Sequence, residues 1–369
     1  MNERALARVD LAAVERNCAR LRRALSGGSE LCAVVKADGY GHGALRCAGA
    51  ALAGGATRLA VATAREAAEL REAHPQAAVL TMGALSAEEV DVALAAGSDI
   101  AAWRAESLAL IADRAREAGR AARVHVKHDS GMGRLGNPDP EQVLALAASA
   151  AADPDLELAG IWTHLATADE PGGFLATQLE AFAAVASVAR ERHPGVLLHA
   201  ANSAATLAEP ASHYDMVRCG IAVYGLDPFG EDSGARELEP ALSLHSYVAD
   251  VKRFEPGDSA GYGRTWRAPE RTWVGVLPIG YGDGVRRGLS NNADVLVGGR
   301  RRPLVGTVSM DNVTVDLGPE TDVSPGDPAV LIGSQGGERI SAEELGARLG
   351  TINYEVTCGI SARVPREYG

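Results

Sequence analysis

The sequence lacks long apolar runs, an excess of positive charge and a regular cysteine framework. None of its apolar runs reaches the length of a membrane span, and the charged amino terminus, MNERALARVD, has no secretory h-region. The net charge of −12 offers no basic footprint for nucleic acid or an anionic membrane surface. The five cysteines are odd in number and fit neither a zinc nor a disulfide spacing. We therefore expect a cytoplasmic globular protein with reduced thiols, no metal and no nucleic-acid or membrane partner.

Lysine is also scarce, since Lys36, Lys127 and Lys252 are the only lysines among 36 cationic side chains. Arginine stays protonated and cannot form an imine, whereas a lysine amine can lose its proton and act as a nucleophile. A lysine retained in such a chain is a candidate for chemistry that arginine cannot perform. Lys252 lies in a polar stretch, VKRFEPGD, and is interpreted as a surface residue.

Eight short apolar runs recur in the first two thirds of the chain, most of them separated by Ala-rich stretches of helical length. The runs are 31–35, 58–63, 77–82, 99–103, 123–128, 158–164, 196–201 and 216–225. This alternation predicts an α/β fold with a parallel sheet and helices outside it. Eight strands suit a closed, TIM-like (β/α)8 barrel, and an open doubly wound sheet is the alternative.

The pattern of apolar and polar residues changes after about residue 234. Short alternating runs punctuated by Gly, Pro and Asp replace the Ala-rich helices, which predicts a C-terminal antiparallel β domain. One late helix is expected where Ser341 and Glu344 form a capping-box pattern. We expect a barrel over residues 9–235 and a β domain over 236–369, which residues 1–8 join.

Polar residues gather at the expected carboxyl ends of the barrel strands, where the active sites of such barrels lie. They are Lys36, Lys127, Asp129, Arg134, His164, Asn202, Ser203 and Arg218, with Gly220 and Ile221 beside them. Each residue alone has an ordinary structural interpretation, so the prediction rests on the whole set sharing one rim. Ser203 and the backbone N–H groups of Gly220 and Ile221 would suit a phosphate. An organic phosphate with a carbonyl held by a lysine imine is pyridoxal 5′-phosphate (PLP).

The segment GMGRLG, residues 131–136, matches a dinucleotide-binding fingerprint. That motif requires a helix that opens at the glycines and faces the pyrophosphate. Here NPDP intervenes over 137–140, and its prolines delay the helix. A nicotinamide-dependent dehydrogenase is therefore disfavoured.

The segment AVVKADGYGHG, which contains Lys36, closely resembles the PLP-attachment signature of alanine racemases. The resemblance covers nearly the whole chain through KHDSGMGRLG, GIWTHLATADE, VRCGIAVYGL, AGYGRTW, IGYGDG, SMDNVTVD and ISARVPREYG. It implies a barrel with a β domain, a head-to-tail homodimer, PLP as cofactor and alanine as substrate. The implied activity is interconversion of L- and D-alanine, which supplies D-alanine for cell-wall peptidoglycan.

The same resemblance implies roles for individual residues. Lys36 and Tyr262 would be catalytic bases on opposite faces of the substrate. Because a free tyrosine has a pKa of about 10, Tyr262 would need a nearby positive charge, for which His164 and Arg218 are the candidates. Arg218, with His164 behind it, would face the pyridine nitrogen of the cofactor. Arg134 and Met310 would bind the substrate carboxylate, and a carbamylated Lys127 would orient Arg134. The residues that bind the cofactor, mostly at its phosphate, would be Tyr40, Asn202, Ser203, Gly220, Ile221 and Tyr354, and those contributed by the partner subunit would be Tyr262, Tyr281, Met310 and Asp311.

Two departures from the family pattern lie near the expected substrate pocket. Gly261 stands where Ser is common, and Ser309 stands where Cys is common. A broader-specificity racemase or a serine racemase is therefore the nearest alternative. Tyr262 and the region 236–369 disfavour a non-catalytic PLP-binding protein, and Arg218 disfavours a decarboxylase, which would usually place a glutamate at the pyridine nitrogen.

Overall fold

The computed structural model describes residues 3–369, which form two compact units. The barrel unit comprises Val14–Gly39 and Ala44–Val223. The β unit comprises the chain up to Ala13, Tyr40–Gly43 and Tyr224–Gly369. Residues 1 and 2 of the expected 1–8 segment lie outside the described residues.

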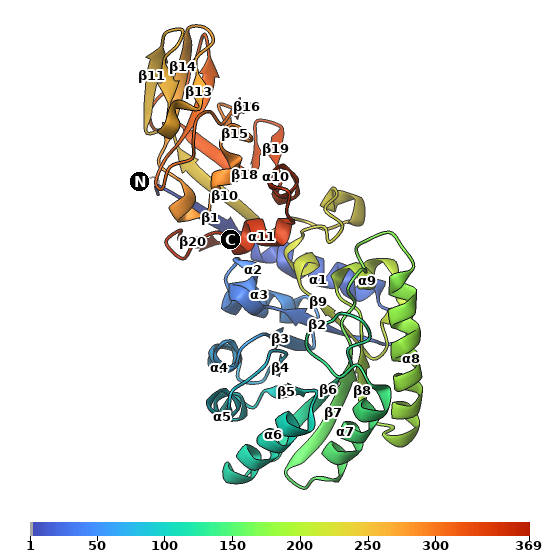
Figure 1. Ribbon diagram of the computed structural model, residues 1–369. Coiled ribbons are helices and arrows are strands. Elements are labelled where there is room, and N and C mark those ends of the chain that lie inside the picture. Colours follow the sequence, from blue (N-terminus) through green and yellow to red (C-terminus); the bar gives the residue numbers. More distant parts are fainter. Residues whose placement is uncertain (1–2) are drawn as a thin grey trace. The chain divides into compact units, whose positions relative to one another are not determined.

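Eight parallel strands close into a barrel in chain order, so the (β/α)8 prediction is confirmed and the open-sheet alternative is wrong (Figure 1). The strands are β2 (Glu30–Val34), β3 (Arg58–Val61), β4 (Ala78–Thr81), β5 (Asp99–Ala102), β6 (Ala122–Lys127), β7 (Leu156–Trp162), β8 (Leu197–His199) and β9 (Met216–Cys219). Closure is made by β2, which pairs in parallel with both β3 and β9.

Helices cover the outside of the barrel (Figure 1). They are α1 (Leu11–Ala24), α3 (Ala44–Ala53), α4 (Ala64–Ala73), α5 (Ala87–Ala95), α6 (Ala105–Glu117), α7 (Pro140–Ala152), α8 (Phe174–Arg192) and α9 (Ser203–Ala208). A short turn, α2 (Lys36–Tyr40), follows β2. Thr63 and Ser86 begin α4 and α5 with capping boxes, in which each side chain accepts from the third helical N–H group. These helices bury their apolar faces against the strands. For example, Phe182 of α8 and Ile161 of β7 belong to one core cluster.

Strand β6 shows how the barrel divides its side chains between two faces. Val124 and Val126 belong to the apolar cluster that packs against the helices. Because side chains alternate along a strand, Arg123, His125 and Lys127 lie on the opposite face, inside the barrel. The interior of such barrels is usually filled by branched apolar residues, and this polar row departs from that rule.

The β unit is mainly antiparallel, as predicted, with one exception. Its largest sheet has the order β16-β15-β18-β10-β1-β20, with β19 paired to β18, and β1 runs parallel to β20. The strands are β1 (Leu6–Val9), β10 (Leu242–Tyr247), β15 (Asp294–Val297), β16 (Arg300–Pro303), β18 (Pro328–Gln335), β19 (Glu338–Ile340) and β20 (Arg366–Tyr368). Smaller sheets pair β11 (Asp250–Phe254), β14 (Thr272–Leu277) and β17 (Val313–Gly318), and β12 (Ser259–Ala260) with β13 (Trp266–Arg267).

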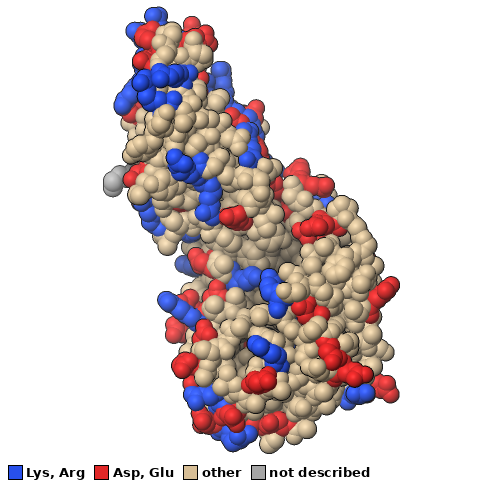
Figure 2. Space-filling model, in the orientation of Figure 1, with Lys and Arg blue, Asp and Glu red and all other residues tan. Residues whose placement is uncertain are grey.

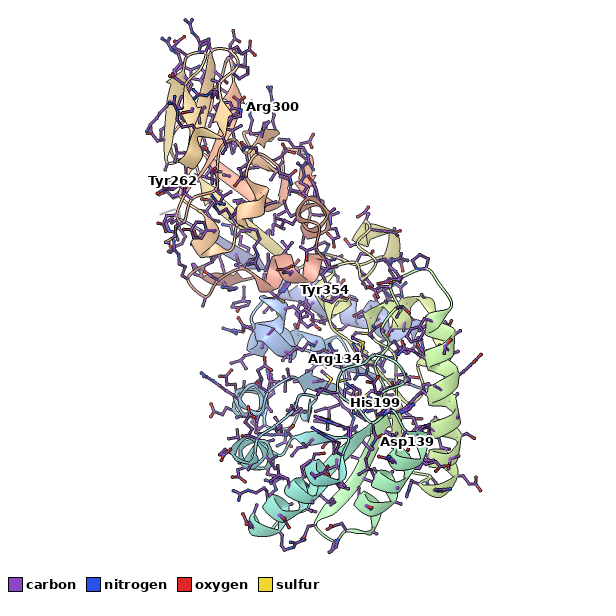
Figure 3. All side chains as sticks on the ribbon, in the orientation of Figure 1. Arg134, Asp139, His199, Tyr262, Arg300 and Tyr354 are labelled. Atoms are coloured by element: carbon purple, nitrogen blue, oxygen red, sulfur yellow. The ribbon has the colours of Figure 1, made fainter. Side chains whose placement is uncertain are left out.

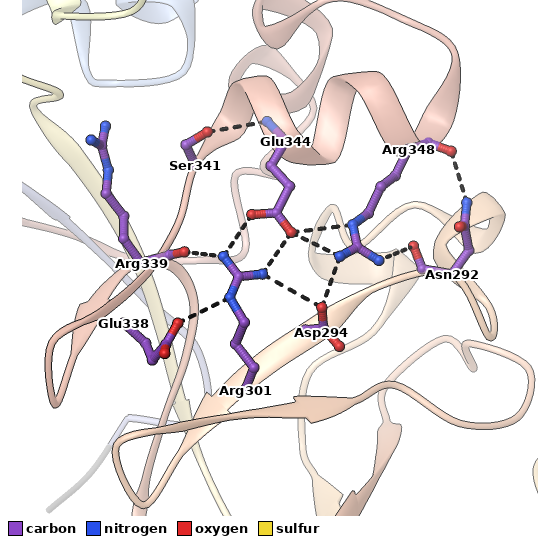
Figure 4. A network of polar contacts seen from close by, with 8 residues as sticks. All are labelled: Asn292, Asp294, Arg301, Glu338, Arg339, Ser341, Glu344 and Arg348. Carbon is purple, nitrogen blue, oxygen red and sulfur yellow. Dashed lines mark hydrogen bonds and ion pairs between the residues drawn. The ribbon is translucent and has the colours of Figure 1, made fainter. Parts of the chain in front are cut away.

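Two helices, α10 (Ala342–Leu349) and α11 (Asn353–Cys358), complete this unit. Ser341 caps α10 as predicted, since its hydroxyl accepts from the N–H of Glu344 at 3.1 Å. The expected reciprocal half of the capping box is wrong, because the Glu344 carboxylate instead accepts from Arg301 and Arg348 (Figure 4). Arg348 also donates to Asp294 at 2.8 Å, so the network ties α10 to β15 and β16.

Glu344→Gln is expected to lower the free energy of unfolding by about 1–2 kcal/mol at neutral pH, because it removes two charge-assisted hydrogen bonds from Arg301. The hydrogen bond from Arg301 lowers the pKa of Glu344 below its ordinary 4.5. The contribution should therefore be fully present above pH 4.5 and disappear as the pH falls through the folded-state pKa.

Thermal or urea unfolding of wild type and variant, at neutral pH and again below pH 4.5, measures this effect. Glu338→Gln is the matched control, because Glu338 reaches the same Arg301 with a side chain that is 51% exposed. The control should cost less than about 0.5 kcal/mol. Equal losses in the two variants would show that the Glu344 contacts are no stronger than a surface ion pair.

Figure 2 shows Lys and Arg side chains interspersed with Asp and Glu side chains over the face that it draws. Over residues 3–369, the helices include none that is both long and apolar enough to cross a membrane.

Candidate active site

Lys36 lies two residues beyond the end of β2, the first barrel strand, and is half-buried. The backbone after it turns the opposite way from an ordinary helix, with φ/ψ of 52°/51° at Ala37, 52°/47° at Asp38 and 62°/42° at Gly39. This left-handed conformation is unfavourable for residues other than glycine. The glycine-rich loop expected here is therefore a strained left-handed turn that begins at Lys36.

Neighbouring groups hold this turn in place. The Glu66 carboxylate, at the start of α4, accepts from the N–H of Ala37 at 2.7 Å and from the N–H of Ala62 at 2.9 Å. Asp38 accepts from the N–H of Ala44 at 2.9 Å. These bonds fix the backbone from which the Lys36 amine extends, and backbone strain of this kind is concentrated at functional sites.

A pocket of about 180 Å³ lies inside the barrel unit and brings together four of the predicted site residues. It is lined by Lys36, Lys127, Arg134 and His164, with Ala62, Met82, Gly83, Leu135 and Trp162. None of these lining residues is acidic, so the pocket has a strong positive potential and is suited to an anionic ligand.

Lys127 is 2% exposed, and its ammonium group lies 4.4 Å from the ring centre of Trp162. Burial, with the nearby charges of Arg218, Arg134 and Lys36, lowers the pKa of Lys127 from 10.5 to about 8. Part of the Lys127 population therefore carries a neutral, nucleophilic amine near neutral pH.

Arg134 lies on a tight loop after β6 and is labelled in Figure 3. The Asp129 carboxylate accepts from the backbone N–H groups of Gly131, Gly133 and Arg134 at 3.0–3.1 Å, which folds the loop around it. Helix α7 begins only at Pro140, with Asp139 as its N-cap. No helix begins at the glycines of 131–136, which confirms the prediction that the prolines of 137–140 delay it.

Arg218 is 3% exposed in the barrel interior. Its two terminal nitrogens donate to the carbonyls of Thr163 and Ala200 and to the rings of His164 and His199, at 2.9–3.3 Å. Burial lowers the pKa of Arg218 from 12.5 to about 10, which still leaves it charged at neutral pH.

Burial and the neighbouring cations, Arg218 first, hold the pKa of His164 well below its usual range. His164 is therefore neutral near pH 7. A second cation beside Arg218 in this buried position is unfavourable, so Arg218 rather than His164 is the charged member of the pair.

Ser203 begins α9, and Asn202 caps that helix by accepting from the N–H of Ala205 at 3.0 Å. The Ser203 hydroxyl oxygen accepts from the N–H groups of Gly220 at 3.0 Å and Ala222 at 3.4 Å. Its own hydrogen can therefore be donated to a ligand. Ile221 follows Gly220, so the residues predicted for phosphate in this unit lie side by side.

Two further predicted phosphate residues lie in the β unit, where the ring centres of Tyr40 and Tyr354 are 6.0 Å apart. The neighbouring glycines pack on the same unit: a Cβ at Gly41 would lie 2.2 Å from the carbonyl oxygen of Thr357, and one at Gly43 would lie 1.9 Å from the Tyr368 hydroxyl. These two glycines therefore permit close approach as well as positive φ.

The other predicted residues of the β unit lie on three neighbouring loops, which contain Tyr262, Tyr281 and Met310 with Asp311. Tyr262 and Met310 line an open depression and are 73% and 50% exposed. The N–H of Tyr281 donates to Ser309, and Arg363 joins Asp311 to the buried Asp283. Figure 3 labels Tyr262 in this unit. At Gly261, φ is 71° and a Cβ would lie 2.9 Å from the N of Thr307, which accounts for glycine there.

Strand-end reasoning missed residues deeper in the barrel, namely Asp99, His125, Trp162 and His199. The alternation in RVHVKH, residues 123–128, could have placed His125 on the same face as Lys127. It could not have shown that His199, from another strand, lies against it.

The chain matches the model of the family "Alanine racemase, N-terminal domain" over residues 9–228 and that of "Alanine racemase, C-terminal domain" over residues 241–368. The chain belongs to the alanine racemase family. Members of the alanine racemase family are isomerases, and the chain is an enzyme of that class.

Curated alanine racemases match along nearly their whole length. The alanine racemase of Symbiobacterium thermophilum is 45% identical over 365 residues, which cover 98% of this chain and 96% of the relative. That of Frankia casuarinae is 41% identical over 373 residues, covering 99% and 96%. The solved alanine racemase of D-cycloserine-producing Streptomyces lavendulae has a TM-score of 0.95 at 36% identity, covering 100% of this chain and 98% of that one.

Proposed function

We propose that the protein interconverts L- and D-alanine with PLP, with Lys36 and Tyr262 as the two catalytic bases. The observation that carries the proposal is the pocket that Lys36 lines together with Lys127, Arg134 and His164, with no acidic side chain among the lining residues. Such a pocket favours a ligand that carries a phosphate and a carboxylate. Family membership supports the same reaction.

The residues present fit PLP. Ser203 has a hydroxyl hydrogen to donate to a phosphate, beside the backbone of Gly220 and Ile221. The hydrogen bonds of Arg218 within residues 3–369 all use its terminal nitrogens, so Nε–H remains as a donor for a ring nitrogen. When bound, PLP supplies an electrophilic carbonyl for the Lys36 amine and a ring that delocalises the charge left by the α-proton.

Each of the proposed site residues then has a defined role in the reaction. Racemisation requires one group to remove the α-proton from one face of the substrate and another to return a proton on the opposite face. Lys36 serves one face and Tyr262 the other. Arg218 stays protonated and limits charge uptake by the ring nitrogen, which disfavours transamination. Arg134 and the backbone N–H of Met310 bind the substrate carboxylate.

We also propose a homodimer in which Tyr262, Tyr281, Met310 and Asp311 complete the site of the partner subunit. Tyr262 and Met310 are large, exposed side chains on paired loops, as expected for residues that a second chain covers. The product D-alanine would serve peptidoglycan synthesis in the cytoplasm.

Racemisation of a panel of L-amino acids by the purified protein tests the function. L-alanine should be the best substrate, with the highest kcat/KM. A higher kcat/KM for L-serine would replace the proposal with the serine racemase alternative, and no turnover of any amino acid in the presence of PLP would refute it.

We propose in addition that Lys127 is carbamylated and that the resulting carboxylate orients Arg134. The low pKa of Lys127 makes its neutral amine available to CO2, and the carbamate would form charge-assisted bonds with Arg134.

Lys127→Ala is expected to lower kcat by about tenfold or more, because Arg134 loses its orienting anion. Added chloride should restore part of this activity, since a small anion can occupy the vacated space. Lys252→Ala, which removes an exposed lysine paired with Asp250 at 3.2 Å, is the control and should be unaffected by chloride. Full activity of Lys127→Ala without chloride would show that the carbamate has no role.

A further inference from the structure

A chain of four side chains crosses the interior of the barrel and ends at Arg218. Arg218 contacts Nδ1 of His199 at 2.9 Å, Nε2 of His199 contacts Nδ1 of His125 at 2.8 Å, and Nε2 of His125 contacts the Asp99 carboxylate at 3.1 Å. Four barrel strands, β5, β6, β8 and β9, contribute one member each. Figure 3 labels His199 in the barrel unit.

The donors and acceptors of this chain allow one arrangement of protons. A guanidinium group has donors only, so the contact of Arg218 with His199 is kept only if Nδ1 of His199 accepts and carries no hydrogen. A neutral imidazole then carries its hydrogen on Nε2, and this hydrogen is donated to Nδ1 of His125. Nδ1 of His125 is thereby an acceptor, so His125 also carries its hydrogen on Nε2 and donates it to Asp99.

The surroundings favour two neutral rings. His125 and His199 are at most 1% exposed, and burial is the main cause that lowers the pKa of both histidines. Asp99 stays ionised because His125, Arg123 and Arg58 offset its burial and lower its pKa. Arg123 donates to the second carboxylate oxygen of Asp99 at 2.9 Å.

Neighbouring residues shape the space around the imidazole rings of His125 and His199. Gly160 on β7 lies under His125, and a Cβ at that position would be 2.2 Å from Nδ1 of His125. On the other side, the Trp162 ring stacks on His199 with an interplanar angle of 5° and a centroid separation of 5.6 Å. The positions of both imidazoles are therefore fixed by packing as well as by hydrogen bonds.

We propose that Asp99 and His125 are positioning residues of the racemisation site: they hold the proton of His199 on Nε2, so that Nδ1 always accepts from Arg218. Without this constraint, His199 could present an N–H group to the guanidinium, and two donors would face each other. Arg218 would then shift away from its bond with His199. The link to catalysis rests on the proposed function, in which Arg218 faces the cofactor ring nitrogen.

The proton arrangement is tested directly by nuclear magnetic resonance on the holoenzyme labelled with ¹⁵N-histidine, because protonated and unprotonated ring nitrogens have very different shifts. Both His125 and His199 should appear as neutral rings with the hydrogen on Nε2. A hydrogen on Nδ1 of His199, or a doubly protonated ring at either position, would overturn the proposal.

The catalytic consequence is tested with His125→Phe, which keeps an aromatic ring but removes the acceptor for His199. We expect the Nε2–H pattern of His199 to be lost and kcat to fall by roughly tenfold or more. KM for alanine should change by less than about twofold, because His125 is not among the substrate contacts.

His213→Phe is the matched control. His213 is also 1% exposed and bonds to the Thr206 carbonyl at 3.0 Å, outside the chain of four. It should leave the His199 signals and kcat per folded protein unchanged. Equal losses of kcat in both variants, or no loss in His125→Phe, would refute the positioning role.

Asp99→Asn provides a milder variant in case His125→Phe fails to fold. It preserves the shape of the side chain but makes it a weaker acceptor, so the Nε2 signal of His125 should shift and kcat should fall less than in His125→Phe. An unchanged His125 signal would overturn the assignment. If wild type racemises nothing, the proposed function fails, while the histidine spectra still decide the proton arrangement.

Discussion

Lys36→Ala is expected to reduce kcat/KM for alanine by at least about 10³-fold, because under the proposed function the variant would lose both the covalent anchor of the cofactor and one of the two bases. Lys252 is exposed on β11 and cannot substitute, and Lys127, which lines the same pocket as Lys36, would be occupied as the proposed carbamate. Activity assays with saturating PLP measure the loss.

Covalent labelling provides the second readout for Lys36. Borohydride reduction of the PLP-loaded wild type, followed by peptide mapping, should place the pyridoxyl group on Lys36 alone. Lys252→Ala, the matched control, should keep both the label and the activity. A label on Lys127 or Lys252 in the wild type would overturn the assignment of the cofactor lysine.

Mixed dimers of Lys36→Ala and Tyr262→Ala are expected to recover about half of the wild-type activity per mixed dimer. In a two-fold symmetric dimer with shared sites, one site of the mixed species carries both substitutions and the other carries neither. Each variant alone should be nearly inactive, because every site then lacks a base. Co-expression with two different affinity tags isolates the mixed species for assay.

The reciprocal pairing makes this experiment decisive. A chain with both substitutions, paired with a wild-type chain, should give an inactive dimer if the sites are shared, since each site then has one defect. If Tyr262 instead acts within its own chain, the wild-type subunit would keep its site and the same dimer would retain about half of its activity. That result, together with inactive Lys36→Ala/Tyr262→Ala mixed dimers, would refute the shared site.

The strand order of the barrel could be predicted from the sequence because each strand is a local apolar run between helical stretches. The barrel strands β2 and β4 begin and end within one residue of the apolar runs 31–35 and 77–82. Lys36 could be found for the same reason, since it directly follows an apolar run in a chain with only two other lysines.

Features that depend on contacts between distant segments could not be predicted. Glu344 has the right spacing for a capping box, but Arg301, which is 43 residues away, binds its carboxylate. The neutrality of His164 follows from burial and from the charge of Arg218 on another strand. Local patterns contain neither the burial nor the distant partner, and these decide which way a polar side chain is used.

At residues 37 and 38, in the left-handed turn after Lys36, thermostability and turnover favour different residues. A residue with a Cβ in this conformation costs about 1–2 kcal/mol, and glycine would remove that penalty at Ala37 or Asp38. Glycine would also loosen the backbone next to the amine, and at position 38 it would delete the carboxylate that binds Ala44. Directed evolution that selects only for heat resistance would therefore accumulate substitutions here that selection for rate removes.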